Sequence, residues 1–304
     1  MVIAGLLFER IGMMFILMFL GMFMFRTGKI TEKGSKDMGN ILIYIVIPAV
    51  VIKSCLSEYS QERLEMFFWS FVLAGASLLL SMAVCALVFK KNPIENFGTS
   101  FSNAGFMSIP LVEAVLGSEA VFYSAPLVGL MNILQWTYGV YVITKDRSTV
   151  SLKKVLLNPV LLAMIVGIII FVLPIELPKV VTGTLDMIAA ANAPLAMLCL
   201  GTYLAQTRIA EIFTDRKVYL SCLFRLIVIP LLTIALMTPF PVSVTAKLAI
   251  LMGAAAPVGI NVAVFAQIHG KDYPQSVKSI VLSTIFSILS MPVIIGIAGT
   301  VWSV

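Results

Sequence analysis

Long stretches without a single charged side chain constrain this chain more than any other feature. Each is about twenty residues long or longer, which is the length of helix needed to cross the roughly 30 Å hydrocarbon core of a membrane. The stretches are residues 66–89, 120–144, 187–207, 248–268 and 279–304. Together they predict an all-α polytopic membrane protein. We therefore expect a multi-pass protein of the cytoplasmic membrane with the lipid bilayer as its main surroundings.

The composition excludes several other classes of protein. Of the 304 residues, 60% are hydrophobic and only 12% are charged, too few for the surface of a soluble domain of this size. The four cysteines all lie in apolar segments without Cys-x-x-Cys spacing, and His269, the single histidine, has no partner motif. The sequence thus predicts no metal site, no cofactor and no catalytic set, and the protein is not expected to be an enzyme.

Ten membrane-spanning helices fit the hydropathy pattern. The first shows no basic leader and no cleavage site, so we expect it to belong to the mature protein. The predicted helices are residues 8–26, 38–56, 66–90, 95–117, 119–144, 157–174, 180–206, 218–238, 244–269 and 275–302.

The basic residues of the loops predict how these helices are oriented. Loops after odd-numbered helices hold 15 of them: Arg26, Lys29, Lys33, Lys36, Lys90, Lys91, Lys145, Arg147, Lys153, Lys154, Arg208, Arg216, Lys217, Lys271 and Lys278. The other side holds 5: Arg10, Lys53, Arg63, Lys179 and Lys247. Because basic loops stay in the cytoplasm, we expect both termini outside. This dispersed charge also gives no reason to expect a nucleic-acid partner.

The ten helices divide into two predicted halves, residues 1–150 and 151–304. Five is an odd number, so the second half would lie inverted relative to the first, as in many secondary transporters. Prolines interrupt corresponding helices: Pro48 and Pro110 are 62 residues apart, and Pro194 and Pro257 are 63 apart. The alternative interpretation is coincidence, since Gly and Pro are common in membrane helices.

The fourth and ninth helices are predicted to be broken near their middles. Ser102-Asn103-Ala104-Gly105 interrupts the fourth, and Pro257-Val258-Gly259-Ile260-Asn261 interrupts the ninth. Within the membrane, such breaks leave backbone groups without hydrogen-bond partners. They therefore occur only where they are buried in protein or face a water-filled cavity. If the breaks cross, the positive N-terminal ends of the half-helices could hold an anion, and the orphan carbonyl groups a cation.

Four amide side chains are the first candidates to line this site. Asn103 and Asn261 lie at the breaks, and Asn132 and Gln135 share a face of the fifth helix. Each could bind substrate, or could simply form a hydrogen bond between helices.

Ionisable residues inside the predicted helices have several interpretations. Arg225 could bind an anionic substrate, pair with Asp186, or extend to the interface, and we favour a structural or gating role. Glu113 follows Pro110 near an outer end, where a solvated position is expected. The chain lacks the paired deep carboxylates of a simple proton-driven carrier.

The residues around both breaks resemble the auxin efflux carrier family. The fourth helix has Asn103-Ala104-Gly105-Phe106-Met107-Ser108-Ile109-Pro110-Leu111, and the ninth has Ala256-Pro257-Val258-Gly259-Ile260-Asn261. The similarity extends over the whole chain. It implies ten helices in two inverted repeats with crossover helices 4 and 9, a scaffold and a transport domain that move like an elevator, a homodimer, and export of small organic anions such as auxins or dicarboxylates.

The resemblance also implies roles for particular residues. Asn103 matches a substrate-contacting crossover asparagine, Pro257 and Val258 match the second crossover, and Gln135 matches a polar residue near the site. Ser102 stands where plant members have proline, which departs from the proton-linked plant pattern. A Ser-Asn pair also resembles sodium-binding pairs of bile-acid symporters, so Na⁺ and H⁺ both stay open as coupling ions.

The sequence therefore predicts a secondary active transporter that exports a small organic anion. Alternatives are sodium- or proton-coupled uptake of an organic anion, a passive channel, or a ligand sensor. The chain has no Gly-x-x-x-x-Gly-Lys-(Ser/Thr) loop, which argues against an ATP-driven pump.

Overall fold

The computed structural model describes residues 2–56, 59–150, 153, 156–173, 175–206 and 215–302. Within these ranges the regular structure is helical, apart from one isolated bridge between two extended segments. This agrees with the all-α class expected from the sequence. The predicted start of the second half at residue 151 and the basic residues Lys154 and Arg208 lie outside the described residues.

Residues 2–149 form α-helices joined by π-helical segments and short connections. The elements are α1 (Val2–Arg26), α2 (Glu32–Ile41), η1 (Leu42–Val46), α3 (Ile47–Ser54), α4 (Gln61–Val88), α5 (Pro93–Ser100), η2 (Ala104–Ser108), α6 (Ile109–Leu116), α7 (Ser118–Leu134), η3 (Gln135–Gly139), α8 (Val140–Thr144) and η4 (Arg147–Thr149).

The later part of the chain, from residue 159 onward, also contains both long and interrupted helices. Its elements are α10 (Pro159–Val172), α11 (Lys179–Ala190), α12 (Asn192–Ala205), α14 (Arg216–Leu223), η5 (Phe224–Val228), α15 (Ile229–Met237), α16 (Val244–Ala255), α17 (Asn261–Ile268) and α18 (Tyr273–Val301).

Among the described residues, 6 helical stretches are long and apolar enough to cross a membrane: Glu32–Ser54, Gln61–Val88, Ser118–Thr144, Lys179–Ala205, Arg216–Met237 and Tyr273–Val301. Shorter apolar helices are Ala104–Leu116, Pro159–Val172 and Val244–Ala255. The ten-span count and the inverted repeat stay predictions.

Several helices begin earlier than the apolar pattern predicts, and polar N-caps explain two of these earlier starts. The second begins at Glu32 rather than residue 38, because the Thr31 hydroxyl accepts a hydrogen bond from the Gly34 amide at 3.1 Å. The third begins at Gln61 rather than residue 66, because Ser60 caps it through the Arg63 amide. These N-caps extend the helices through polar residues that hydropathy alone assigns to loops.

Three of the predicted prolines are accommodated by wide helical turns or by helix starts. Pro48 and Pro110 each follow a π-helical segment, η1 and η2, in which the residue before the proline donates to the carbonyl five positions earlier. The wider turn removes the clash between the proline ring and the carbonyl four residues before it. Pro194 lies in the first turn of α12, where its missing amide hydrogen costs nothing.

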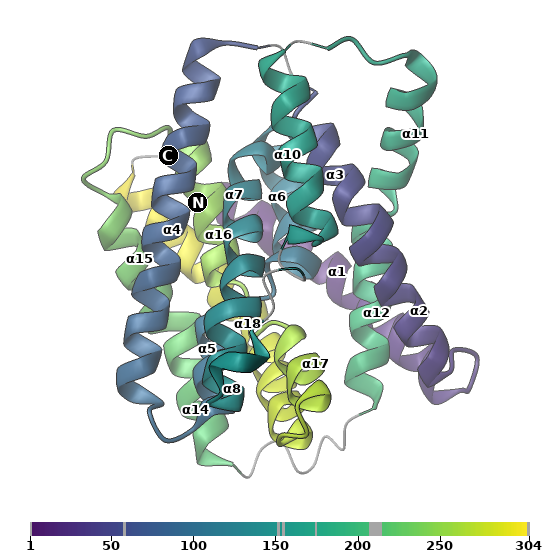
Figure 1. Cartoon of the computed structure of the whole chain (residues 1–304), viewed down its shortest axis with the longest axis vertical. Coiled ribbons are helices and arrows are strands. Elements are labelled where there is room, and N and C mark those ends of the chain that lie inside the picture. The colour runs from purple at the N-terminus through teal and green to yellow at the C-terminus, as the bar shows by residue number, and fades with distance from the viewer. Residues whose placement is uncertain are drawn as a thin grey trace.

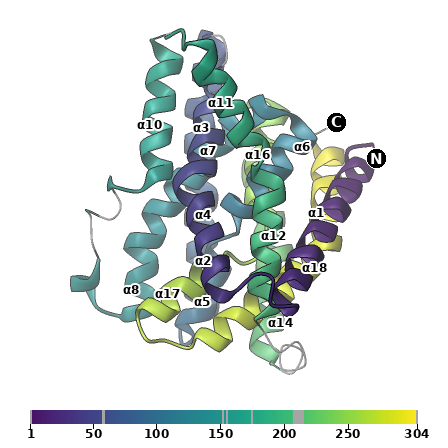
Figure 2. The ribbon, with the colours of Figure 1, turned by 90° about the vertical axis from the view of Figure 1, so that its right-hand side faces the viewer.

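The helices form two groups that pack against each other. One contains α1, α2, α3, α10, α11 and α12, with α1 against α12 and α3 against α10 and α11. The other contains α4, α5, α7, α14, α15, α16 and α18, with α7 between α4 and α16. Figures 1 and 2 show the first group on one side of the molecule, and the two ends of the chain close together.

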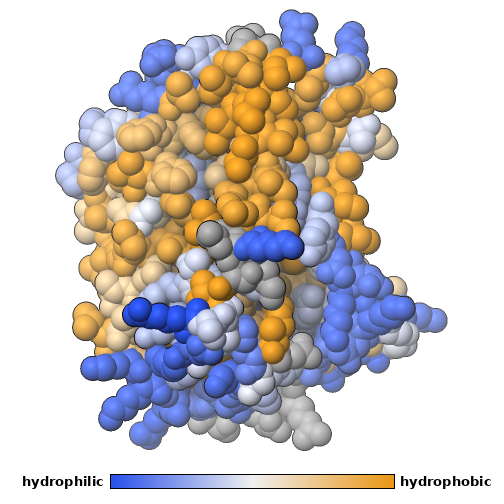
Figure 3. Space-filling view, viewed as in Figure 1, coloured by the Kyte–Doolittle hydropathy of each residue, from blue (hydrophilic) through white to orange (hydrophobic). Residues whose placement is uncertain are grey.

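The outer surface has the polarity of a membrane protein. Large apolar side chains are exposed along several long helices, for example Phe23 on α1, Phe68 and Leu87 on α4, and Leu289 on α18. In Figure 3 a broad hydrophobic face lies between hydrophilic residues gathered at the lower and upper edges. This face has the character expected of a surface against lipid.

Close contact between α1 and α12 depends on Gly201, and we predict that Gly201→Ala destabilises the protein. A Cβ atom there would overlap the backbone of Met18 and Met22. Overpacking of this kind costs about 1–3 kcal/mol. Thermal unfolding in detergent should show a lower midpoint for this variant. Gly183→Ala on α11, where a Cβ atom meets nothing within 4 Å, is the matched control. Equal midpoints for both variants would show that this packing is unimportant.

Candidate functional site

The two broken helices meet and pair with each other. α5 ends at Ser100 and η2 begins at Ala104, while α16 ends at Ala255 and α17 begins at Asn261. Between them the Asn103 amide donates to the Pro257 carbonyl at 2.8 Å, and the Gly259 amide donates to the Phe101 carbonyl at 3.1 Å. Ser102 and Val258 thereby form a single antiparallel bridge. The crossing of the breaks expected from the sequence is confirmed.

Local chemistry explains why the second connection is extended and close to the first. Pro257 cannot donate a helical hydrogen bond and disfavours helical backbone at Ala256, whose φ and ψ of −62° and 151° are extended. Gly259 has no side chain where one would intrude, since a Cβ atom there would lie 2.7 Å from the Ser102 carbonyl oxygen. The Val258 amide is satisfied separately by the Ser283 hydroxyl of α18 at 3.0 Å.

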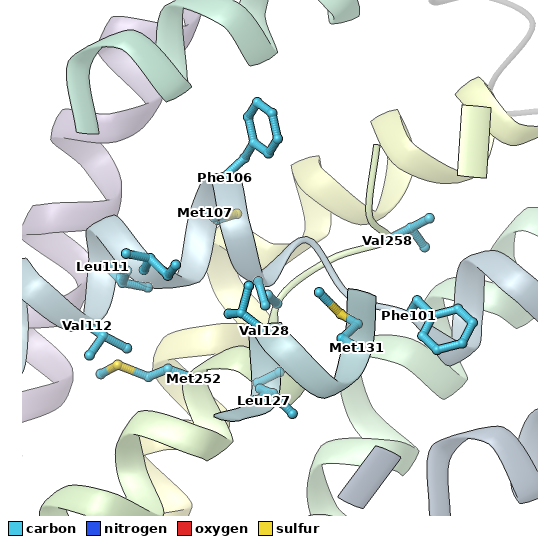
Figure 4. Close-up of a cluster of buried hydrophobic side chains, with 14 of the residues drawn as sticks. Phe101, Phe106, Met107, Leu111, Val112, Leu127, Val128, Met131, Met252 and Val258 are labelled. Atoms are coloured by element: carbon cyan, nitrogen blue, oxygen red, sulfur yellow. The ribbon is translucent and has the colours of Figure 1, made fainter. Parts of the chain in front are cut away.

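Apolar side chains surround the crossing. Figure 4 shows Leu127, Val128 and Met131 of α7 beside the two connections, with Met252 of α16 to their lower left. The Ser102 hydroxyl lies 3.8 Å from the Met131 sulfur atom. On this side the crossing is therefore covered by apolar side chains.

A cavity of about 680 Å³ lies on one side of the crossing. Both helix groups line it: Asn40 and Tyr44 belong to the α1–α3 group, and Asn103, Asn132 and Asn261 to the α7 and crossover group. Aromatic rings of Phe106, Trp136 and Phe265 also line it. The cavity therefore combines amide groups with a largely apolar wall, as small-molecule sites do.

Two amide nitrogens at the site have no hydrogen-bond partner among the described residues. They are Nδ2 of Asn103, which lines the cavity, and Nε2 of Gln135, which does not line it, and both are buried. An unsatisfied buried donor costs about 1–3 kcal/mol, so such groups are expected to meet an acceptor from a ligand or from water. The side-chain oxygen of Gln135 accepts a hydrogen bond from Asn261 Nδ2 at 2.7 Å. This bond connects η3 to the start of α17.

The structure separates the other candidates from one another. Asn132 lines the cavity, donates to the Val128 carbonyl and accepts from Asn158. Asp186 does not meet Arg225 but forms an ion pair with Lys53 at 3.1 Å. Arg225 instead donates to backbone carbonyls at the crossover. Pro48, Pro110 and Pro194 shape helices near the site without lining the cavity.

Three polar residues were not singled out by the sequence analysis. Lys153 and Asn158 line the cavity, and Lys153 is the one charged side chain among its described lining residues. Asn158 carried a usable signal, because Asn before Pro marks a helix start, and its side chain caps α10. Glu95 is buried in α5, where it accepts from Gln275 and Ser279. Its neighbours lie far away in the sequence, so no local pattern revealed it.

Half-helices that cross, with a cavity at their N-terminal ends, are typical of membrane transporters built on broken helices. A family model described as "Membrane transport protein" matches residues 6–153 and 144–295. The chain therefore belongs to this family, which is that of the auxin efflux carriers. It is also 25% identical over 290 residues to a protein of Methanocaldococcus jannaschii named as an uncharacterized transporter, covering 90% of this chain and 93% of the relative.

The hydrogen bond between Asn261 and Gln135 should couple the two residues energetically. We predict that Asn261→Ala and Gln135→Ala together destabilise the protein by less than the sum of the single changes, with a coupling of about 0.5–1.5 kcal/mol. A double-mutant cycle on denaturant unfolding in detergent measures it. Strictly additive effects would mean that this contact contributes nothing to stability.

Proposed function

We propose that the protein is a secondary active transporter that exports a small organic anion across the cytoplasmic membrane by elevator-like alternating access. The observation that carries this proposal is the charge and donor character of the cavity. Its described lining residues include Lys153 and five asparagines but no carboxylate. Such a lining favours a ligand that accepts hydrogen bonds and carries negative charge.

The backbone also gives the cavity a lining that favours a negatively charged ligand. Gly105 and Phe106, at the start of η2, and Asn261, at the start of α17, all line the cavity. Helix N-termini carry a partial positive charge and unpaired amide groups, which suit a carboxylate. The unpartnered Nδ2 of Asn103 adds a side-chain donor at the same place.

The position of the cavity between the two helix groups supports an elevator. Tyr44 and Asn158 line it from the α1–α3, α10–α12 group, which would be the scaffold. Asn103 and Asn261 line it from the crossover group, which would carry the substrate. Sliding one group along the other would move the crossover with its ligand and leave the facing wall behind.

The cavity borders a loop predicted to be cytoplasmic, which an exporter needs in order to load its substrate. Lys153 lies in the loop after the fifth predicted helix, which the distribution of basic residues assigns to the cytoplasm. A cavity that reaches this loop would load its substrate from the cytoplasm. The homodimer expected from the family resemblance is part of the same proposal and is to be tested by the mass of the detergent-solubilised protein.

Counterflow in proteoliposomes tests the carrier function, with labelled indole-3-acetate and malate as probes. We predict that Asn103→Ala lowers the transport rate at least about tenfold, as loss of a hydrogen bond to a charged ligand implies. Asn103→Asp, which is nearly isosteric but negatively charged, should lower it further. Equal counterflow by all three proteins would rule out a substrate at this asparagine, and flux without saturation would indicate a channel.

Lys153 should contribute to affinity rather than to turnover. We predict that Lys153→Gln raises the KM for the anion about two- to fivefold with little change in kcat, because a single solvated charge contributes modestly. Lys91→Gln is the matched control, since Lys91 is exposed and does not line the cavity. The same KM in both variants would contradict a role for Lys153.

A further inference from the structure

Arg225 is buried at the crossover and does not line the cavity. Its side chain is 2% exposed. In the described part of the chain no carboxylate forms an ion pair with it. A buried charge without an acidic partner is costly, so its other contacts must stabilise it.

Those contacts are the carbonyl ends of both half-helices. Nη1 of Arg225 donates to the carbonyls of Thr99 at 3.0 Å and Ser100 at 3.4 Å, which are the last two residues of α5. Nη2 donates to the carbonyl of Ala254, in the last turn of α16. One side chain thus binds two helix C-termini that approach from different parts of the sequence.

The positive charge of Arg225 balances the partial negative charges of the two helix C-termini. Each helix C-terminus carries roughly half a negative elementary charge, and the carbonyls of the last turn have no partner within the helix. Two converging ends therefore amount to about one negative charge, which the single positive charge of Arg225 offsets. In transporters built on broken helices, such carbonyl ends are where a coupling cation binds.

We propose that Arg225 is a permanent counter-cation of the crossover, which fills the place of a metal ion and makes transport independent of Na⁺. It is a positioning residue: it holds the C-terminal ends of α5 and α16 together and so fixes the N-terminal ends that face the cavity. The guanidinium group suits the place because it is planar, always charged and has several donors for carbonyl oxygens. This proposal rests on the proposed transport function only where transport is measured below.

Thermal unfolding of the purified protein without substrate tests the charge independently of transport. Wild-type protein should unfold at the same temperature in equal millimolar concentrations of sodium, potassium and choline chloride. Arg225→Ala should unfold at a lower temperature, and guanidinium or Na⁺ should raise that temperature more than choline does. Arg63→Ala is the control, because the Arg63–Glu119 ion pair lies at the surface, and it should respond to none of these cations.

Stabilisation of the wild type by Na⁺ alone would overturn the proposal, because it would place a metal ion at a site we assign to Arg225. Equal recovery of Arg225→Ala in all salts, choline included, would also overturn it. These outcomes do not depend on whether the protein transports anions.

Two further variants keep the test decisive if Arg225→Ala does not fold. Arg225→Lys retains the charge, and Arg225→Met retains only the length and apolar volume. In proteoliposomes we expect wild-type counterflow of indole-3-acetate or malate to be unchanged when choline replaces Na⁺. The Met variant should lose about tenfold or more in rate, and the Lys variant should recover most of it. Equal rates for the Lys and Met variants, or a wild type that requires Na⁺, would refute the proposal.

Discussion

The structure depends on one constraint: interrupted helices inside an apolar protein must find partners for the backbone groups that the interruptions expose. Two hydrogen bonds between the connections, from Asn103 to Pro257 and from Gly259 to Phe101, satisfy part of this demand. Ser283 satisfies another amide, and Arg225 satisfies three carbonyls. Without a crossing partner, each break would expose unpaired groups to hydrocarbon, at a cost of several kcal/mol per group.

Because the two breaks cross, their opposite polarities separate in space. The N-terminal ends of η2 and α17 face the cavity with Asn103 and Asn261, and the C-terminal ends of α5 and α16 face Arg225. A single crossing therefore produces a positive surface toward the cavity and a negative one toward a buried arginine. In the proposed function, recognition of an anion would need no lysine within the crossing itself, and Lys153 lies instead in the loop segment that borders the cavity.

Close packing at glycines and polar contacts between helices occur in both helix groups. Within the α1–α3, α10–α12 group, close glycine contacts and the Lys53–Asp186 ion pair join the helices. Within the crossover group, hydrogen bonds such as Thr99–Ser221 and Asn261–Gln135 connect polar side chains of different helices. The cavity is lined from both groups, so in the proposed mechanism its shape would change when the groups move relative to each other.

The sequence by itself determined the membrane class, the places of the two breaks and the asparagines beside them. These features are local: the length of an apolar run, the missing amide hydrogen of Pro257 and the bare backbone of Gly259 can each be recognised without knowing any neighbour. The tertiary structure alone decided that Asp186 meets Lys53, that Arg225 binds the ends of α5 and α16, and that Glu95, Lys153 and Asn158 take the positions they do. Such contacts join residues far apart in the chain, and an isolated charge in an apolar helix is compatible with many partners until the packing of the helices selects one.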